Sequence, residues 1–293
     1  MIKRPMLAAT AKDEAALRAH WPGTVLASPK LDGIRCLAHP ELGAVSRSFK
    51  PIPNEYIRDC LDEDYHYLDG ELITYTDGVR DDYNTVQSKV MSRAGDPEWQ
   101  LIVFDSFRSP DAPFMERLHH AYLDSYTLEN AVCLEHPHVE SPDKFMELAS
   151  KWLAAGQEGA MYRHPEGLYK DGRSTLRQGW LVKWKQFLDA EGTVVGYQER
   201  MHNENEKTMD AFGLIERSSH KAQMTGMGTL GALLLETSWG TLRVGTGFDD
   251  AQRQWIWDHQ EMHMGLKATF KYQPYGVKDK PRFPVFLRWR MEE

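Results

Sequence analysis

Cysteine is scarce in this chain of 293 residues, which contains three, at positions 36, 60 and 133. They form no C-x-x-C pair, so the sequence predicts neither a disulfide framework nor a zinc knuckle, and a reduced, cytoplasmic setting fits best. Long apolar runs are also absent. Residues 1–21 lack the apolar core of a signal peptide, and no stretch is long enough to span a membrane. We therefore expect a soluble intracellular protein that does not associate with membranes.

Basic residues are in deficit over the chain as a whole. Lysine and arginine number 35 against 43 aspartates and glutamates, and the formal net charge of -8 argues mildly against nucleic-acid binding. The balance reverses near the end, where residues 267–290 contain seven basic side chains and one acid, hence a local charge of +6. Such a basic strip is typical of a phosphate-binding surface, although an ordinary solvated face explains the charge equally well.

Internal repeats and low-complexity tracts are absent as well, and the length allows one large domain or two moderate ones. The first part of the chain mixes strands and helices. Residues 65–75, 99–107 and 175–187 are predicted as strands, because β-branched and aromatic residues are bounded there by turn formers. Residues 141–156 are predicted as a helix with Ser141 as its N-cap.

From Asp189 onward, short apolar runs separated by glycine turns surround one predicted helix over residues 249–262. This pattern favours a small β-barrel of the OB type, so we place a domain boundary between residues 188 and 189. The long polar segment 201–228 interrupts this second domain. Loops of that length in compact domains are usually functional or disordered.

The segment ASPKLDGIRC, residues 27–36, brings Lys30, Asp32 and Arg35 together just after a proline. One interpretation is a surface turn, because Pro29 and the Asp-Gly pair are ordinary turn formers and lysine is usually a solvated charge. The other is an amine nucleophile, Lys30, with supporting charged groups. A single short motif does not decide between them.

Five further islands follow along the chain: VSRS (45–48), LDGEL (68–72), IVFD (102–105), EGAMYR (158–163) and LVKWKQF (181–187). Each taken alone has an ordinary explanation, as a surface charge, a strand residue, a core aromatic or a loop. Lys183 and Lys185 are harder to explain in this way, because residues two apart in a strand share a face. Two lysines on one face repel each other unless an anion such as a polyphosphate lies against them.

Together the islands supply what an amine needs in order to attack the α-phosphate of a nucleotide. Lys30 is the candidate nucleophile, and Phe104 is an aromatic side chain that can stack on a base. Glu71 and Glu158 are carboxylates that suit Mg²⁺, which binds oxygen ligands together with phosphate oxygens. Four cations can neutralise a phosphate chain: Arg35, Arg47, Lys183 and Lys185.

KLDGIR resembles the K-x-D-G-x-R adenylation motif of the covalent nucleotidyltransferases, and the other islands follow in that superfamily's order and spacing. Three later segments resemble the small ATP-dependent DNA ligases of phages and large DNA viruses: RSSHKAQ (217–223), VGTGFDDAQRQWIW (244–257) and VKDKPRFPVFLRWR (277–290). The resemblance covers essentially the whole chain. It implies an α+β protein, with a nucleotidyltransferase (adenylation) domain of antiparallel sheets and helices over residues 1–188. A C-terminal OB-fold β-barrel follows over residues 189–293.

The same resemblance implies an enzyme that transfers AMP from ATP to Lys30, passes it to the 5′-phosphate at a nick in duplex DNA and then joins the strands. Mg²⁺ is the implied cofactor, with Mn²⁺ as a substitute. No obligatory protein partner is implied, and we expect a monomer. Residues 201–228 correspond to the latch of such viral ligases, a segment that closes around DNA.

The resemblance also implies a role for each candidate residue. In the nucleotide site these are Ser28 at the adenine edge, Phe104 on the ring, Glu71 on the ribose or the metal, Glu158 on the metal, Lys183 and Lys185 on the α-phosphate, Arg35 and Arg47 on the phosphates of ATP or of the nick, and Asp32 in the later steps. The implied DNA contacts are Arg35, Arg47, Arg217, Lys221, Lys278, Lys280 and Arg282.

One feature departs from the family pattern, and two other functions compete. Many ligases end with an R-x-D-K element, whereas RFPVFLRWRMEE has Arg288 and Arg290 but no Asp-Lys pair, an ending similar to that of the small viral forms. An RNA ligase or an mRNA-capping guanylyltransferase would share the lysine chemistry, and the capping enzyme would take GTP. A non-catalytic OB-type nucleic-acid-binding protein would explain the basic strip but not the two lysines opposite two carboxylates.

Overall fold

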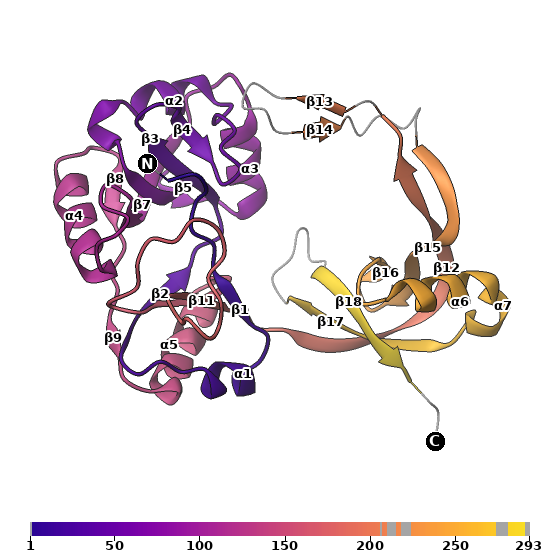
Figure 1. Ribbon diagram of the computed structural model, residues 1–293. Coiled ribbons are helices and arrows are strands. Elements are labelled where there is room, and N and C mark those ends of the chain that lie inside the picture. Colours follow the sequence, from indigo (N-terminus) through magenta and orange to yellow (C-terminus); the bar gives the residue numbers. More distant parts are fainter. Residues whose placement is uncertain (1, 206, 210–214, 218–223, 274–280, 291–293) are drawn as a thin grey trace. The chain divides into compact units, whose positions relative to one another are not determined.

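The computed structural model describes residues 2–205, 207–209, 215–217, 224–273 and 281–290. The chain divides into two compact units, Met1–Lys185 and Gln186–Glu293, which we call unit 1 and unit 2 (Figure 1). Both units mix strands and helices, in agreement with the α+β prediction. All three cysteines are free thiols. Within the described part of the chain, no helix is both long enough and apolar enough to cross a membrane.

Unit 1 contains two sheets, and we call the first the wall sheet. In spatial order its strands are β4 (Gly43–Ser46), β3 (Ile34–His39), β5 (Leu68–Thr76), β7 (Glu98–Ser106) and β8 (Ala131–Cys133), with β6 (Val79–Arg80) paired to β5. Neighbours are antiparallel except for β7 and β8. In β7 the buried Leu101 and Val103 alternate with the more accessible Ile102 and Phe104, because successive side chains of a strand point to opposite faces.

The second sheet of unit 1, which we call the floor sheet, carries the KLDGIR lysine. Its strands in spatial order are β1 (Ala9–Ala11), β11 (Leu181–Trp184), β10 (Gly159–Arg163), β2 (Val25–Lys30) and β9 (His138–Val139). All neighbours are antiparallel except β1 and β11. Since β2 ends at Lys30 and β3 begins at Ile34, the KLDGIR motif is the connection from the floor sheet to the wall sheet.

Helices cover the two sheets of unit 1. The predicted helix near residue 141 is confirmed as α5, where the Ser141 side chain accepts a hydrogen bond from the Lys144 amide and Gly156 follows the helix at a φ of 80°. This helix packs on the floor sheet, whereas α3 and α4 pack on the wall sheet. The helices of unit 1 are α1 (Glu14–Ala19), α2 (Glu55–Cys60), α3 (Tyr83–Met91), α4 (Phe114–Tyr126) and α5 (Pro142–Ala154), with a short 3₁₀ helix at Glu63–Tyr65.

A separate group of apolar side chains joins the wall sheet to the floor sheet, and we call it the intersheet cluster. Its buried members are Ile2, Met6, Leu37, Val45, Phe107, Tyr169 and Leu181. Leu37 and Val45 come from the wall sheet and Leu181 from the floor sheet, while Met161 of β10 packs against the group. The two sheets of unit 1 therefore share one packed interior.

In its described residues, unit 2 has a five-stranded antiparallel sheet, two helices and a separate two-stranded ladder. The strands of the larger sheet in spatial order are β16 (Gly240–Val244), β15 (Met224–Thr237), β12 (Leu188–Asn203), β17 (Lys267–Gln273) and β18 (Arg282–Trp289). The described strands do not form a barrel closed by a continuous ladder. Among the described residues, the two edges meet through one parallel bridge between Thr246 and Val285, where the Phe286 amide donates to the Thr246 carbonyl oxygen at 2.9 Å.

Three sequence predictions differ from the structure in detail. The strand predicted over residues 175–187 is confined to Leu181–Trp184, because Thr175 and Gln178 close a hydrogen-bonded turn that ends at Gly179. The single helix predicted over 249–262 is two, α6 (Asp250–Asp258) and α7 (Gln260–His263), separated at His259. The long loop predicted over 201–228 is strand at both ends, because residues 201–203 of β12 pair with residues 224–226 of β15. Between these strands β13 (Lys207–Met209) pairs with β14 (Ile215–Arg217), and residues 206, 210–214 and 218–223 lie outside the described residues.

Candidate active site

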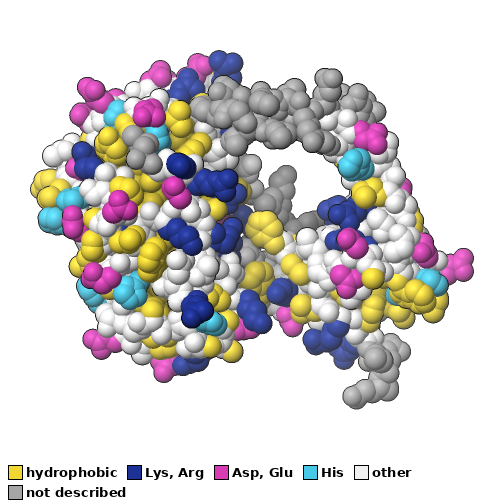
Figure 2. Space-filling view, in the orientation of Figure 1, with side chains coloured by type: hydrophobic (Ala, Val, Ile, Leu, Met, Phe, Trp, Pro, Cys, Tyr) yellow, Lys and Arg dark blue, Asp and Glu magenta, His cyan; other side chains and the backbone are white. Residues whose placement is uncertain are grey.

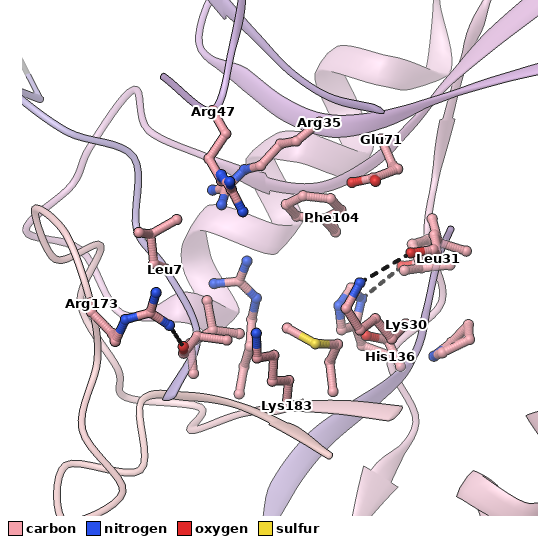
Figure 3. A pocket seen from close by; sticks show the side chains of 17 residues that line it. Leu7, Lys30, Leu31, Arg35, Arg47, Glu71, Phe104, His136, Arg173 and Lys183 are labelled. Carbon is pink, nitrogen blue, oxygen red and sulfur yellow. Dashed lines mark hydrogen bonds between the residues drawn. The ribbon is translucent and has the colours of Figure 1, made fainter. Parts of the chain in front are cut away.

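A pocket of about 200 Å³ lies between the wall sheet and the floor sheet of unit 1 (Figure 3). Seven of the residues predicted from sequence line it: Ser28, Lys30, Arg35, Arg47, Glu71, Phe104 and Lys183. Other lining residues are Leu7, Ala8, Pro29, Leu31, Leu134, His136, Met161, Arg163, Arg173 and Leu181. Six of the lining side chains are basic and one, Glu71, is acidic, so the pocket is suited to a polyanion.

Strand register sets a row of side chains across the floor of the pocket. Ser28 of β2 is the cross-strand partner of Met161 in β10, and Met161 is the partner of Lys183 in β11. Cross-strand partners share one face of a sheet, so the three side chains all lie on the pocket side. Lys30 lies two residues beyond Ser28 on the same strand and shares that face.

Glu158 lies between Lys30 and Lys185. Its carboxylate forms ion pairs with Lys30 Nζ and with Lys185 Nζ, and its side chain is 8% exposed. Burial alone would raise the pKa of Glu158, but the two lysines hold that pKa below its ordinary value. A side chain at Gly159 would place its Cβ 2.3 Å from the Trp184 carbonyl oxygen, so glycine is required for β10 to approach β11 this closely.

Lys183 and Lys185 do not act as a simple pair on one strand. Lys183 belongs to β11 and lines the pocket, whereas Lys185 follows the end of that strand and contacts Glu158. Burial lowers the pKa of Lys183, and Lys185, Lys30 and Arg173 lower it further. This crowding of positive charge around Lys183 would be relieved by a phosphate.

Glu71 projects into the pocket from β5 of the wall sheet. Burial raises the pKa of Glu71 to about 7, although Lys30 and Arg35 act in the opposite direction. A carboxyl group with such a raised pKa in a cleft is a candidate for a functional role. Asp32 lies in the connection after β2 and is not among the lining residues.

Two buried carboxylates hold arginines behind the pocket. Asp69 accepts hydrogen bonds from Arg35 Nε at 2.9 Å and Nη2 at 2.6 Å, while Arg35 Nη1 donates to the Met6 carbonyl oxygen at 2.7 Å. Asp105 pairs with Arg117 at 2.9 Å and with Arg163 at 2.7 Å. Arg35 therefore reaches the pocket as a fixed charge whose hydrogen bonds are largely used within the protein.

Phe104 is the aromatic side chain of the pocket wall. The guanidinium carbons of Arg35 and Arg163 lie 5.6 and 5.7 Å from the centroid of its ring. The ring is only partly buried, because the alternation of β7 turns it toward the pocket and away from Val103 and Asp105. It is therefore available for stacking on a base.

Sequence reasoning missed three side chains that line the pocket: His136, Arg163 and Arg173. Arg163 belongs to the EGAMYR island but carried no predicted role. Arg173, which is exposed, donates from Nη1 to the Ala8 carbonyl oxygen at 2.7 Å. Neither His136 nor Arg173 lies in an island, since both enter from connections between strands.

The residues predicted to contact DNA from unit 2 are only partly described. Arg282 begins β18, and its guanidinium carbon lies 5.2 Å from the centroid of Phe283, whose side chain is exposed. Lys221, Lys278, Lys280 and the side chain of Arg217 lie outside the described residues. In unit 1, lysine and arginine side chains gather on the face that Figure 2 presents.

Two family models match this chain. A family model described as ATP dependent DNA ligase domain matches residues 5–185, and one described as DNA ligase OB-like domain matches residues 223–290. A DNA ligase of African swine fever virus is 28% identical over 138 residues, which are 45% of this chain and 32% of the viral protein. The chain thus spans about a third of the length of the curated relatives it matches.

Solved structures are similar over the whole chain. The Chlorella virus DNA ligase-adenylate is 29% identical, with all of both chains covered and a TM-score of 0.56. A structure of a Lig E DNA ligase is 23% identical, covers 99% of this chain and 100% of its own, and has a TM-score of 0.73; it supports the fold alone.

Proposed function

Because the chain belongs to the family of ATP-dependent DNA ligases, we propose that it seals nicks in duplex DNA through an AMP intermediate on Lys30. The observation that carries this proposal is the position of Lys30. Its amine lies in a pocket lined by cations and is ion-paired to Glu158, which also pairs with Lys185. Similarity to ligases of African swine fever virus and Chlorella virus supports a phage or viral origin.

In the first step, the Lys30 side chain gives up a proton to solvent, and its neutral nitrogen attacks the α-phosphorus of ATP. An N–P bond forms, the bond between the α-phosphorus and the bridging oxygen breaks, and pyrophosphate leaves. We assign Lys183, which lines the pocket, to the α-phosphate, and the exposed Arg47 and Arg173 to the phosphates that follow. Ser28 and Phe104 border the space for the base, and Glu71 that for the ribose.

Two further substitutions at phosphorus complete the reaction. An oxygen of the 5′-phosphate at the nick attacks the phosphorus of the lysine adenylate, so that the N–P bond breaks and DNA carries the AMP. The 3′-hydroxyl oxygen then attacks the 5′-phosphate, and AMP leaves as the phosphodiester forms. We assign Asp32 to these later steps.

We assign a divalent cation to the carboxylates of the site. Within the described residues, no three His, Cys, Asp or Glu side chains are grouped to hold a metal, so the protein offers Glu71 and Glu158 rather than a complete cage. Mg²⁺ suits such a site, because it commonly binds through one or two carboxylates together with substrate phosphates, and Mn²⁺ accepts similar ligands. When bound, the cation supplies charge neutralisation at the phosphate oxygens.

We further propose that residues 189–293 contact the DNA and that the protein acts as a monomer. The assigned phosphate contacts are Arg217, Lys221, Lys278, Lys280 and Arg282, with Arg35 and Arg47 in unit 1. A capping enzyme or RNA ligase is not favoured, because both matched family models are those of DNA ligases. A non-catalytic binding protein would leave the Lys30–Glu158–Lys185 arrangement without a purpose.

The test is to incubate the protein with Mg²⁺ and ATP labelled at the α-phosphate and to resolve it on a denaturing gel. A labelled band at the 33.7 kDa of the chain, labile to acid, is expected from the native protein and from the control Lys12→Ala, whose lysine is exposed and does not line the pocket. Lys30→Ala should give no labelled band. Adding nicked duplex DNA to the labelled native protein should remove the label from the protein. A labelled Lys30→Ala protein would refute the assignment of Lys30 as the nucleophile. Label that stays on the native protein after nicked DNA is added would refute the assignment of nicked DNA as the substrate.

A further inference from the structure

His136 lies at one end of the row of side chains that crosses the pocket floor. β9 pairs with β2 through Leu26 and His138, and the Ala27 amide donates to the Pro137 carbonyl oxygen at 2.9 Å. His136 therefore flanks Ser28 on the side opposite Met161, and it lines the pocket (Figure 3). Its ring packs edge-on against Phe114, with the ring centroids 5.4 Å apart.

The hydrogen bonds of His136 determine which ring nitrogen faces the pocket as an acceptor. Nδ1 lies 2.8 Å from the Leu134 carbonyl oxygen, and since a carbonyl can only accept, Nδ1 must carry a proton. Within the residues that the structure describes, Nε2 has no hydrogen-bond partner, and it is not among the fully buried polar atoms that lack one. Nε2 is therefore exposed to solvent, and because His136 lines the pocket we infer that this nitrogen faces it.

The charge state of the ring makes this nitrogen an acceptor and not a donor. Burial and the nearby Arg163 lower the pKa of His136 to about 4, so the ring is neutral at physiological pH. A neutral imidazole that donates from Nδ1 presents a lone pair at Nε2. The Leu134 carbonyl prevents the alternative tautomer, because that tautomer would place two lone pairs against each other.

A base in this pocket would meet that lone pair at its edge. Phe104 offers an aromatic face on the wall and Met161 an apolar side chain on the floor, so a planar base between them would lie alongside Ser28 and His136. At position 6, adenine carries an amine that donates, whereas guanine carries a carbonyl oxygen that only accepts.

We propose that His136 Nε2 accepts a hydrogen bond from the 6-amino group of adenine and thereby selects ATP over GTP. The inference rests on the proposed function, since it requires that the pocket bind a purine nucleoside triphosphate. His136 is on this account a specificity-determining residue: it does not touch the reacting phosphorus, and its effect falls on nucleotide binding. With GTP, two lone pairs would oppose each other in a partly desolvated site.

The experiment compares ATP with purine riboside triphosphate, which differs only in lacking the 6-amino group, and with GTP. Attachment of the nucleoside monophosphate to the full-length protein is followed at a series of concentrations. The native protein should use ATP about 2- to 10-fold better than the analogue in kcat/KM, the value of one neutral hydrogen bond, with the difference in KM. Its preference for ATP over GTP should be about 5-fold or more, because the unpaired acceptor adds a desolvation cost.

Three variants isolate the contribution of the histidine. His136→Leu removes the acceptor and should bring the ratio of ATP to analogue close to one. His136→Gln carries an amide that can rotate to accept from adenine or donate to guanine, so it should keep ATP use and lose the rejection of GTP. His138→Leu changes an exposed histidine two residues away and should keep the native ratios.

Equal use of ATP and the analogue by the native protein would overturn the inference without any variant. Native ratios in His136→Leu or His136→Gln would overturn it as well. Failure of the proposed function has a different signature, namely that no nucleotide becomes attached to the native protein. In that case the same three nucleotides are compared by calorimetric binding, where a loss of the preference for ATP in His136→Gln would still support the role of His136.

Discussion

Replacing Glu71 with glutamine should make the protein more resistant to heat at alkaline pH while lowering its rate of adenylation. Burial raises the pKa of Glu71 to about 7 from an ordinary value of 4.5. Between these values the folded chain binds more protons than the unfolded chain, so the free energy of unfolding falls as pH rises through this window. Glutamine has nearly the same shape and keeps one acceptor oxygen for the Gly33 amide, but it carries no charge to desolvate.

The size of the effect follows from the shift in pKa. The difference of about 2.5 between the two pKa values corresponds to about 3 kcal/mol at 1.36 kcal/mol per unit. The charge of Glu71 destabilises the folded native protein by this full amount above about pH 7 and not at all below about pH 4.5. Because the residue is partly accessible to solvent, we expect about 2 kcal/mol. For a domain of this size that is a gain of roughly 4–8 °C in Tm.

The assay is thermal unfolding of the native protein and Glu71→Gln at pH 5, 7 and 9, without nucleotide or metal. Asp69→Asn is the matched control, because it removes a buried carboxylate that is paired with Arg35 and should destabilise by about 3–5 kcal/mol at pH 7. An increase in Tm that is the same at pH 5 and pH 9, or a lower Tm for Glu71→Gln at pH 9, would refute the reasoning. Adenylation by Glu71→Gln should fall about tenfold or more.

Two other changes test the remaining parts of the proposal. Glu158→Gln leaves Lys30 and Lys185 without their carboxylate and should destabilise by about 1–3 kcal/mol at pH 7. Because the folded pKa of Glu158 is depressed, its stabilisation is present above the ordinary carboxyl pKa and disappears as pH falls through the folded one. Thermal unfolding at pH 7 and pH 3 checks this, and a constant difference would contradict it. Deleting residues 203–228 should spare AMP attachment but weaken binding to a nicked duplex in a filter or gel-shift assay, and native affinity for the nick would remove the latch assignment. Binding by the intact protein should also weaken as salt rises.

Sequence predicted the site best where its geometry is local. Ser28 and Lys30 share a face because they are two apart in a strand, and the alternation of β7 turns Phe104 away from the buried Val103. The α5 helix could be predicted from sequence equally well, since Ser141 and Gly156 mark its two ends. In these cases neighbouring residues carry all the information that the structure uses.

The rest of the site depends on pairings between distant segments. Nothing near Arg35 reveals that Asp69 accepts two of its hydrogen bonds. The contact of Glu158 with two lysines likewise requires the close approach of β10 to β11 at Gly159. His136 reaches the pocket only because β9 pairs with β2. The same limit applies to unit 2, where the separation of α6 from α7 and the bridge between its sheet edges are tertiary outcomes.

The intersheet cluster makes the width of the pocket between the two sheets depend on the packing of an apolar interior. Leu181 belongs to that cluster and also lines the pocket, and Met161 packs on the cluster while forming the pocket floor. Because packed interiors transmit changes in volume, trimming Leu37 or Val45 would shift the two sheets as well as weaken the fold. Conditional alleles are therefore expected to arise here most readily. A variant trimmed in this cluster would be active at low temperature and, on warming, would lose affinity for ATP before it unfolds.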